Sequence, residues 1–280
     1  MSAEREMAER ARFEFGENWL RFLALLDDRR IADAEASLRE MLAVQDLRNL
    51  RFLDIGCGSG LFSLAARRLG ASVHSFDFDP QSVACARELK RRYFPDDAGW
   101  RIEGGSVLDA AFMSKLGRFD VVYSWGVLHH TGAMWLALEH AIARVSPEGG
   151  RLFVAIYADQ GWKSHAWWFV KLFYNRLPRF LRPLYVFVVS ALVRLLVILK
   201  YTILLRPMTA IAPLFGDRRG RGMSAKHDRV DWIGGFPYQF ATLETLTSYL
   251  EARGFSMIAT RRAGSLGCHE LVARRMPCAE

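Results

Sequence analysis

The stretch "RFLDIGCGSGLFSLAARRLG", residues 51–70, constrains the fold of this chain more than any other segment. Its first part, "RFLDI", is apolar with a β-branched end and predicts a short buried strand. Its last part, "LFSLAARRLG", has the apolar spacing of a helix that stops at Gly70. The glycines between them let the backbone pass close to a ligand, because no Cβ intervenes. The stretch therefore predicts the strand, glycine turn and helix that open a nucleotide-binding βαβ unit.

The spacing of the glycines indicates which ligand the loop binds. A dinucleotide loop reads GxGxxG and seats a pyrophosphate on a helix N-terminus. This loop reads GxGxG, with Leu61 where the third dinucleotide glycine would fall and Asp54 two residues before the first glycine. An acid at that place favours a ligand with an amino group and a cationic centre over a pyrophosphate. Asp77 ends the next apolar run, "ASVHSFDFDP", where a carboxylate can accept both ribose hydroxyls.

Four motifs in this order carry a family resemblance. They are "LDIGCGSG", "VHSFDFDP", "FDVVYSWGVLHH" (119–130) and "ARVSPEGGRLFVAIY" (143–157). Together they resemble the class I S-adenosylmethionine-dependent methyltransferases. The resemblance implies an α/β, Rossmann-like fold with a seven-stranded, mostly parallel sheet and helices on both faces. It also implies S-adenosyl-L-methionine as cofactor and S-adenosyl-L-homocysteine as product.

The resemblance also assigns cofactor contacts. Asp77 would hold the ribose, Phe78 would flank the adenine, and Ser124 with Trp125 would line the methionine part. Trp19, in a helix ahead of the first motif, either belongs to a lid over the cofactor or packs on the sheet. The expected cofactor-binding residues are Asp54, Gly56, Cys57, Gly58, Gly60, Asp77, Phe78, Ser106, Val107, Leu108, Ser124, Trp125 and Trp19. Asp109 either reaches the adenine amine or caps the helix that follows it.

Two histidines follow the fourth predicted strand. Methyl transfer requires an aligned acceptor and often the removal of its proton. His129 and His130 lie next to the expected position of the methyl group, and histidine titrates in the useful range. We therefore expect one of them to be the general base, although positioning of the acceptor alone is an alternative.

The rest of the chain divides around this core. Residues 1–48 are helical in pattern and form the N-terminal extension; residues 49–157 and 241–280 form the cofactor-binding domain. "SMIATRRAG" and "HELVARRM" predict a terminal hairpin after a helix capped at Thr242. Residues 158–240 are a helical cap inserted after the fifth strand. Because loops after parallel strands sit on the ligand side of the sheet, we expect this cap to shape the substrate site.

The cap is basic and aromatic. It contains 13 Lys or Arg and four Asp, whereas the whole chain has a net charge of +8, so the rest of the chain is nearly neutral. Its aromatic residues favour a substrate with an apolar or ring component, and its arginines favour an acidic group. The expected substrate-binding residues are Trp162, His227, Trp232 and His269. For each of these, a structural contact is the alternative.

Residues 184–205 of the cap, "LYVFVVSALVRLLVILKYTILL", are largely apolar and carry only two charges, Arg194 and Lys200. As a helix they would be about 33 Å long, enough to cross a bilayer core of about 30 Å. An arginine at mid-bilayer costs about 2.5–3.5 kcal/mol, however. A single span would also separate the two halves of one sheet. Two alternatives remain: a buried cap or dimer helix, and a helix that lies in a membrane interface.

The sequence thus predicts a methyltransferase for a small, partly apolar acceptor, with O- or N-methylation of a lipid, quinone or other metabolite. The pattern "FGENW" at residues 15–19, together with "RGMSAKHDRVDWIGGFPYQF" at residues 221–240, resembles the bacterial ubiquinone-biosynthesis-like methyltransferases. The alternatives are an RNA or protein methyltransferase, and a non-enzymatic, membrane-associated protein that binds the cofactor. We expect no metal, because the four cysteines lack zinc-like spacing. Contact with nucleic acid is not expected, and a homodimer is allowed. We expect a cytoplasmic location, with the inner face of the membrane as an alternative.

Overall fold

A single sheet of seven strands forms the centre of the molecule. The computed structural model describes residue 23 and residues 26–203, 232–264 and 267–277. The strand order is β3-β2-β1-β4-β5-β7-β6; β1 to β5 pair in parallel, and β7 is antiparallel to β5 and β6. This confirms the predicted fold class and the terminal hairpin. The strands are β1 (Arg51–Ile55), β2 (Ser72–Asp77), β3 (Trp100–Gly104), β4 (Val121–Trp125), β5 (Arg151–Tyr157), β6 (Phe255–Arg261) and β7 (Cys268–Arg275).

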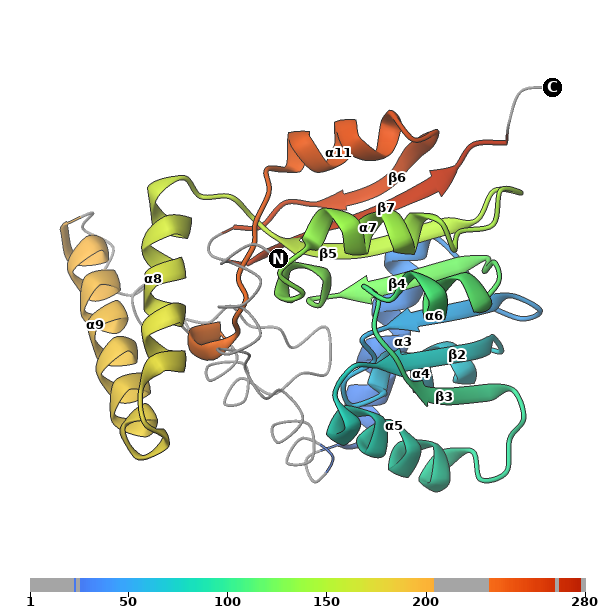
Figure 1. Ribbon diagram of the computed structural model, residues 1–280, viewed down its shortest axis with the longest axis horizontal. Helices are drawn as coiled ribbons and strands as arrows, with labels where there is room; N and C mark the ends of the chain where they lie inside the picture. Colours follow the sequence, from blue (N-terminus) through green and yellow to red (C-terminus); the bar gives the residue numbers. More distant parts are fainter. Residues whose placement is uncertain (1–22, 24–25, 204–231, 265–266, 278–280) are drawn as a thin grey trace.

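Helices cover both faces of the sheet, and Figure 1 shows the strands between these two layers. One apolar core lies under α3, α4 and α5, and a second lies under α6, α7 and α11. The helices of the first layer are α3 (Asp28–Leu42), α4 (Leu61–Arg68) and α5 (Pro80–Tyr93). Those of the second are α6 (Ala110–Lys115), α7 (Met134–Ile142) and α11 (Leu243–Glu251).

Side-chain caps fix where two helices of the second layer, α6 and α11, begin. Asp109 accepts hydrogen bonds from the backbone N–H groups of Ala111 (2.9 Å) and Phe112 (3.0 Å) at the start of α6. Of the two roles left open for Asp109, the structure therefore shows the helix cap. Thr242 caps α11 in the same way, through the N–H of Thr245 at 3.0 Å, as the sequence predicts.

The insertion after β5 forms a helical hairpin beside the sheet. It consists of α8 (Trp162–Arg176), the short helix η2 (Arg179–Leu181) and α9 (Arg182–Ile203), and Figure 1 shows α8 and α9 next to each other, away from the strands. Within the described ranges, Arg179–Ile203 is one stretch that is long and apolar enough to cross a membrane. Strands before and after the insertion nevertheless pair, and Ala158 bridges to Ala241 at its two ends. A lone crossing by α9 is therefore excluded.

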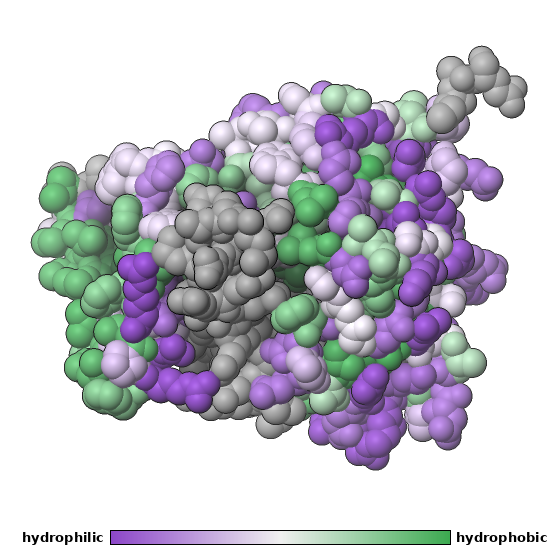
Figure 2. Space-filling view, in the orientation of Figure 1, coloured by the Kyte–Doolittle hydropathy of each residue, from purple (hydrophilic) through white to green (hydrophobic). Residues whose placement is uncertain are grey.

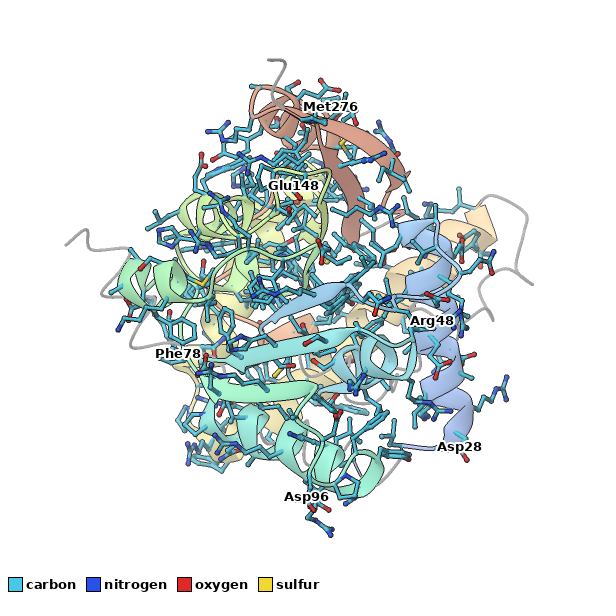
Figure 3. All side chains as sticks on the ribbon, turned by 90° about the vertical axis from the view of Figure 1, so that its right-hand side faces the viewer. Asp28, Arg48, Phe78, Asp96, Glu148 and Met276 are labelled. Carbon is cyan, nitrogen blue, oxygen red and sulfur yellow. The ribbon has the colours of Figure 1, made fainter. Side chains whose placement is uncertain are left out.

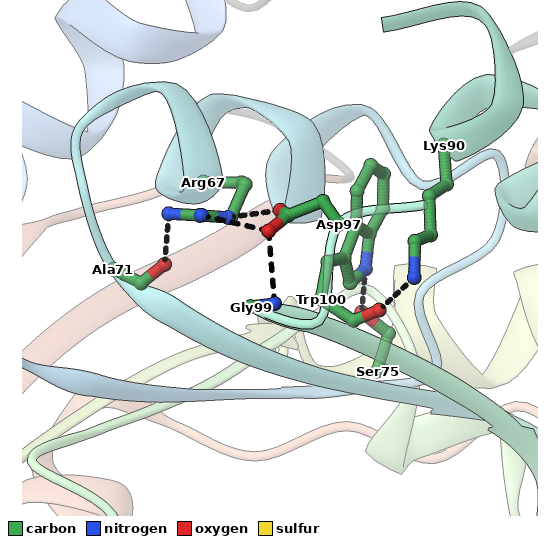
Figure 4. Close-up of polar contacts among 7 residues, drawn as sticks. All are labelled: Arg67, Ala71, Ser75, Lys90, Asp97, Gly99 and Trp100. Atoms are coloured by element: carbon green, nitrogen blue, oxygen red, sulfur yellow. Dashed lines mark hydrogen bonds and ion pairs between the residues drawn. The ribbon is translucent and has the colours of Figure 1, made fainter. Parts of the chain in front are cut away.

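A partly buried polar cluster holds β2 and β3 to α4. Arg67 on α4 donates two hydrogen bonds to the Asp97 carboxylate, at 2.5 and 3.0 Å, and Asp97 also accepts from the N–H of Gly99 (Figure 4). The indole N–H of Trp100, which is fully buried, donates to the hydroxyl of Ser75 at 2.9 Å. Because an indole N–H can only donate, Ser75 is the acceptor on which the burial of Trp100 depends.

Removing this acceptor should destabilise the fold. We expect Ser75→Ala to lower the free energy of unfolding by about 1–3 kcal/mol, because the Trp100 N–H then stays buried without a partner. Urea denaturation measures the loss. Ser114→Ala, at an exposed serine of α6, is the matched control and should stay within about 0.5 kcal/mol of the wild type. Equal stability of the two variants would contradict this role of Ser75.

Candidate functional site

The loop between β1 and α4 has a conformation that requires glycine. Gly56, Gly58 and Gly60 have φ angles of 74°, 53° and 82°, in the left-handed region. A Cβ at Gly56 would also lie 2.4 Å from a methyl carbon of Val127, and one at Gly60 would lie 3.0 Å from Ala86. The loop therefore packs against the chain after β4 and against α5 at distances that no side chain allows.

Asp77 joins this loop to the end of β2. One oxygen of its carboxylate accepts the backbone N–H of Gly58, and the other accepts that of Asp79, both at 2.9 Å. A carboxylate has lone pairs beyond these two, so it can still accept hydroxyl groups of a ligand. Phe78 follows directly; its side chain is 56% exposed, and Figure 3 labels it beyond the end of β2. The carboxyl edge of β2 thus offers an acceptor and an aromatic ring side by side.

A chain of hydrogen bonds runs beneath the loop and ends at Asp54. The Trp100 N–H donates to Ser75, the hydroxyls of Ser75 and Ser63 are 2.6 Å apart, and Ser63 donates to the Asp54 carboxylate at 2.5 Å. Because Trp100 can only donate and Ser63 donates to Asp54, Ser75 donates to Ser63. Every donor in the chain therefore points toward this carboxylate. Hydrogen bonds aligned in this way polarise one another and stabilise the charged form of Asp54.

Burial nevertheless disfavours the charge on Asp54. It raises the pKa of this carboxyl to about 7; the Ser63 hydrogen bond opposes the rise and the charge of Asp77 adds to it. A cation bound next to Asp54 and Asp77 would favour the charged form of both carboxyl groups, so this pair of acids attracts a cation. Cys57 lies beside them, and burial together with both acids raises the pKa of its thiol well above the usual value. Cys57 therefore stays a protonated, unreactive thiol.

The residues at this edge fit the adenosyl cofactor that the sequence predicts. Such a ligand needs acceptors for two ribose hydroxyls, negative charge near its cationic end and room along the strand ends. Asp77 and Asp54 supply the first two. Room is left at Gly104, the last residue of β3, and at Gly126, directly after β4, since a Cβ on either would meet no atom within 4 Å.

Two other groups of predicted cofactor residues lie at the same edge. The Ser106 hydroxyl accepts the N–H of Leu108 at 3.2 Å, and His140 contacts the carbonyl of Val107 at 2.6 Å, so this loop after β3 is fixed. Ser124 is buried and donates to the carbonyl of Ile55 at 3.1 Å, which ties β4 to β1. Its hydroxyl is thus used within the sheet. Trp19 lies outside the described residues.

Trp125, at the end of β4, is held by a partner that the sequence analysis did not identify. Its indole N–H donates to Glu270 of β7 at 2.9 Å, and Glu270 is buried. Arg261 of β6 bridges Glu270, at 3.2 Å, to Glu40 of α3, at 2.9 Å. These bonds orient the Trp125 ring from three elements. The signal for Glu270 was a lone acid in the apolar strand "CHELVARR".

The two histidines after β4 have different surroundings. His129 is buried against Tyr157, and its Nδ1 accepts the Tyr157 N–H at 3.2 Å, so the neutral ring carries its proton on Nε2. Burial lowers its pKa well below the usual value, and the charges of His130 and Lys171 add to this. His130 contacts the carbonyl of Pro237 through Nδ1 at 2.6 Å. A carbonyl can only accept, so His130 carries its proton on Nδ1 and its Nε2 is the basic atom.

The predicted substrate residues are not all brought together. Trp162 is 76% exposed at the start of α8, whereas Trp232 packs against Trp167, with ring centres 3.9 Å apart and ring planes tilted by 38°. His269 is buried opposite Ile156 of β5, accepts the Ala263 N–H through Nδ1, and has a pKa lowered by burial. His227 lies outside the described residues. Within the described part of the chain, no group of three or more His, Cys, Asp or Glu could hold a metal ion.

A buried lysine connects the cap to this edge, and the sequence analysis missed it. Lys171 of α8 is fully buried and donates to the carbonyl of Trp232 at 2.7 Å. Its Nζ also lies 5.2 Å from the ring centre of Tyr157 and 5.0 Å from that of Tyr238. The only cue in the sequence was a single lysine within "WWFVKLFY".

Comparisons with known proteins agree with this geometry. The model of a family described as "Methyltransferase domain" matches residues 26–260. Two curated relatives are ubiquinone biosynthesis O-methyltransferases: that of Xanthomonas oryzae pv. oryzae is 37% identical over 110 residues (39% of this chain, 44% of the relative), and that of Parvibaculum lavamentivorans is 32% identical over 124 residues (44% and 46%). The chain thus spans less than half the length of the curated relatives that it matches.

Solved structures share the fold. The magnesium protoporphyrin IX methyltransferase of Synechocystis PCC 6803, with bound S-adenosylhomocysteine, has a TM-score of 0.54 at 14% identity, over 92% of this chain and 93% of that one. The 1,6-didemethyltoxoflavin-N1-methyltransferase of Burkholderia thailandensis has a TM-score of 0.52 at 16% identity, over 99% and 92%. At these identities the likeness concerns the fold.

The raised pKa of Asp54 predicts how stability depends on pH. The native carboxyl holds its proton up to about pH 7, whereas an unfolded one loses it near 3.8, so the stabilisation from this proton is complete below pH 3.8 and is lost as the pH rises through 7. The loss approaches an upper bound of about 4 kcal/mol. We expect Asp54→Asn, without added ligand, to gain stability relative to the wild type between pH 5 and pH 8.

Urea denaturation at several pH values measures this difference. Asp97→Asn is the control: the Arg67 guanidinium lowers the pKa of Asp97, so its contribution is lost only in acid, below the unfolded value. That variant should be less stable by an amount that stays constant from pH 5 to pH 8. A constant difference for Asp54→Asn as well would refute the buried, proton-binding carboxyl.

Proposed function

The chain belongs to the methyltransferase-domain family, and we propose that it transfers a methyl group from S-adenosyl-L-methionine to a small, partly apolar acceptor. The main support for the proposal is the hydrogen bond between the glycine loop and Asp77, whose carboxylate accepts the Gly58 N–H at 2.9 Å. The buried Asp54 lies beside it. Fold, loop spacing and charge at this edge all fit the same cofactor.

Each residue at this edge then has a defined task. The cofactor supplies a methyl group activated by its bond to a cationic sulfur. Asp77 accepts the ribose hydroxyls, and the exposed ring of Phe78 flanks the adenine. The charge of Asp77, and that of Asp54 once it has lost its proton, favour a cationic ligand over a neutral one. Trp125, oriented by Glu270, walls the methionine end. S-adenosyl-L-homocysteine leaves as product.

The hydrogen bonds of the two histidines support His130 over His129 as the base that takes the acceptor's proton. His130 directs Nδ1 to the Pro237 carbonyl, which leaves Nε2 as the basic atom. His129 uses Nδ1 to accept the Tyr157 N–H, and burial lowers its pKa. His129 therefore suits a positioning role, in which it holds the end of β5 against the chain after β4.

The acceptor is a small molecule with a ring or an apolar part, methylated on oxygen or nitrogen. Aromatic side chains of the cap cluster next to the carboxyl end of β5, and Lys171 is buried among them. A ring packs well in such surroundings. An RNA or protein acceptor is the second candidate. It has less support, because Gly126 and Val127 follow β4 in this chain. Enzymes that methylate base amino groups have a pattern similar to [DN]PP[YF] there.

Transfer of radiolabelled methyl from the cofactor into a cell lysate tests the proposal. We expect the label in the organic or the aqueous small-molecule fraction. Label in RNA or protein would support the second candidate instead. Cofactor binding without transfer into any fraction would refute an enzymatic function. Once the acceptor is known, His130→Ala should lower the turnover rate by about 10²–10⁴-fold with unchanged cofactor affinity. His165→Ala, at an exposed histidine of α8, is the matched control.

A further inference from the structure

The outer side of α9 is a continuous apolar surface. Its residues recur at helical spacing, and all of them are exposed. All have large apolar side chains except Ala191, which is small. We call these residues the outer stripe: Leu184, Phe187, Val188, Ala191, Leu195 and Ile198. Figure 2 shows apolar residues gathered on the left of the molecule, where α9 lies, whereas hydrophilic residues are most frequent on its right-hand side.

The helix does not behave as a core helix. Val189 is the one residue of α9 that is buried, and the opposite side of the helix meets α8 through Tyr185, Val186 and Val193. A contiguous exposed surface of this kind marks a site of association with a protein or a membrane. The hairpin therefore has two sides: an inner side that packs on the aromatic cluster of the cap, and the outer stripe.

The charge of the hairpin indicates the partner. Residues 162–203 contain seven Lys or Arg and no Asp or Glu. Arg176, Arg179 and Arg182 lie at the turn between α8 and α9, and Arg194 and Lys200 are exposed on α9 itself. Exposed aromatic side chains accompany them: Trp162, Phe169, Phe173, Phe180 and Phe187. Exposed apolar and aromatic residues framed by cations are the composition of helices that bind anionic membrane surfaces.

We infer that the α8–α9 hairpin docks on the surface of an anionic lipid bilayer, with α9 lying in the plane of the interface and the outer stripe turned toward the acyl chains. Arg194 lies at the edge of the outer stripe, so its long side chain can reach the headgroups while its stem stays in the apolar layer. The pairing of β5 with β7 excludes a lone crossing, so the helix lies on the bilayer and does not span it.

A second copy of the chain is a poorer partner for this surface. A symmetric contact between two hairpins would bring positive charges together, and residues 162–203 offer no acid to neutralise them. Anionic lipid headgroups neutralise them without any specific geometry. Because Tyr157 at the end of β5 belongs to the cluster under the hairpin, docking would hold the candidate site beside the bilayer.

Vesicle flotation of the full chain tests the inference and needs no methyl transfer, so its outcome is independent of the proposed function. We expect binding to phosphatidylcholine vesicles that contain phosphatidylglycerol, weaker binding to phosphatidylcholine alone, and a further loss in high salt. Phe187→Glu with Leu195→Glu should lower the affinity for the anionic vesicles by at least about tenfold. Leu136→Glu, at a leucine that is 41% exposed on α7, is the matched control and should bind as the wild type does.

Three results would overturn the inference. The first is no binding of the wild type to either kind of vesicle, and the second is equal binding by the double variant and the wild type. The third is a wild-type dimer, seen by light scattering, that the double variant dissociates while neither protein binds lipid. Unchanged circular dichroism and thermal midpoint of the double variant exclude misfolding as the cause of a loss.

Discussion

The rest of the site depends on the hydrogen bonds that end at the buried carboxylate of Asp54. This carboxylate lies under the glycine loop. Burial raises its pKa and so disfavours the charged form, whereas the chain of hydrogen bonds from Trp100 through Ser75 and Ser63 stabilises that form. That chain links β3, β2, α4 and β1, so the same hydrogen bonds that support the charge also hold the strands whose ends form the site. Burial of this carboxyl lowers stability at neutral pH, which fits the proposed binding of a cationic ligand.

Local pattern accounted for much of the fold. The helix cap at Thr242 and the terminal hairpin depend on residues close together in the chain, and both are confirmed. Of the two roles left open for Asp109, the structure shows the helix cap. The partners of Trp125 and Lys171 were not predicted, because Glu270 and Trp232 are far from them in sequence. Only the pairing of β7 with β5, and the return of the chain under α8, bring those groups together.

The insertion gives a common fold its particular character. Its inner side extends the carboxyl edge of the sheet with tyrosines, tryptophans and one buried lysine, while its outer side exposes an apolar helix among arginines. The two ends of the insertion meet at Ala158 and Ala241, directly beyond β5. The cap is therefore anchored at the strand that borders the candidate site. Whatever binds its outer side lies near the acceptor side of the sheet.

The central claim is that an adenosyl cofactor binds at the edge joined by Asp77 and the glycine loop. Calorimetric titration of S-adenosyl-L-homocysteine into the wild type, Asp77→Ala and Asp120→Ala tests it most directly. Asp120 lies before β4, at the opposite edge of the sheet, where its carboxylate accepts the Arg51 N–H. We expect at least about a tenfold loss of affinity for Asp77→Ala alone, since one ribose acceptor contributes about 1.4 kcal/mol or more. Equal affinity of all three proteins would contradict it.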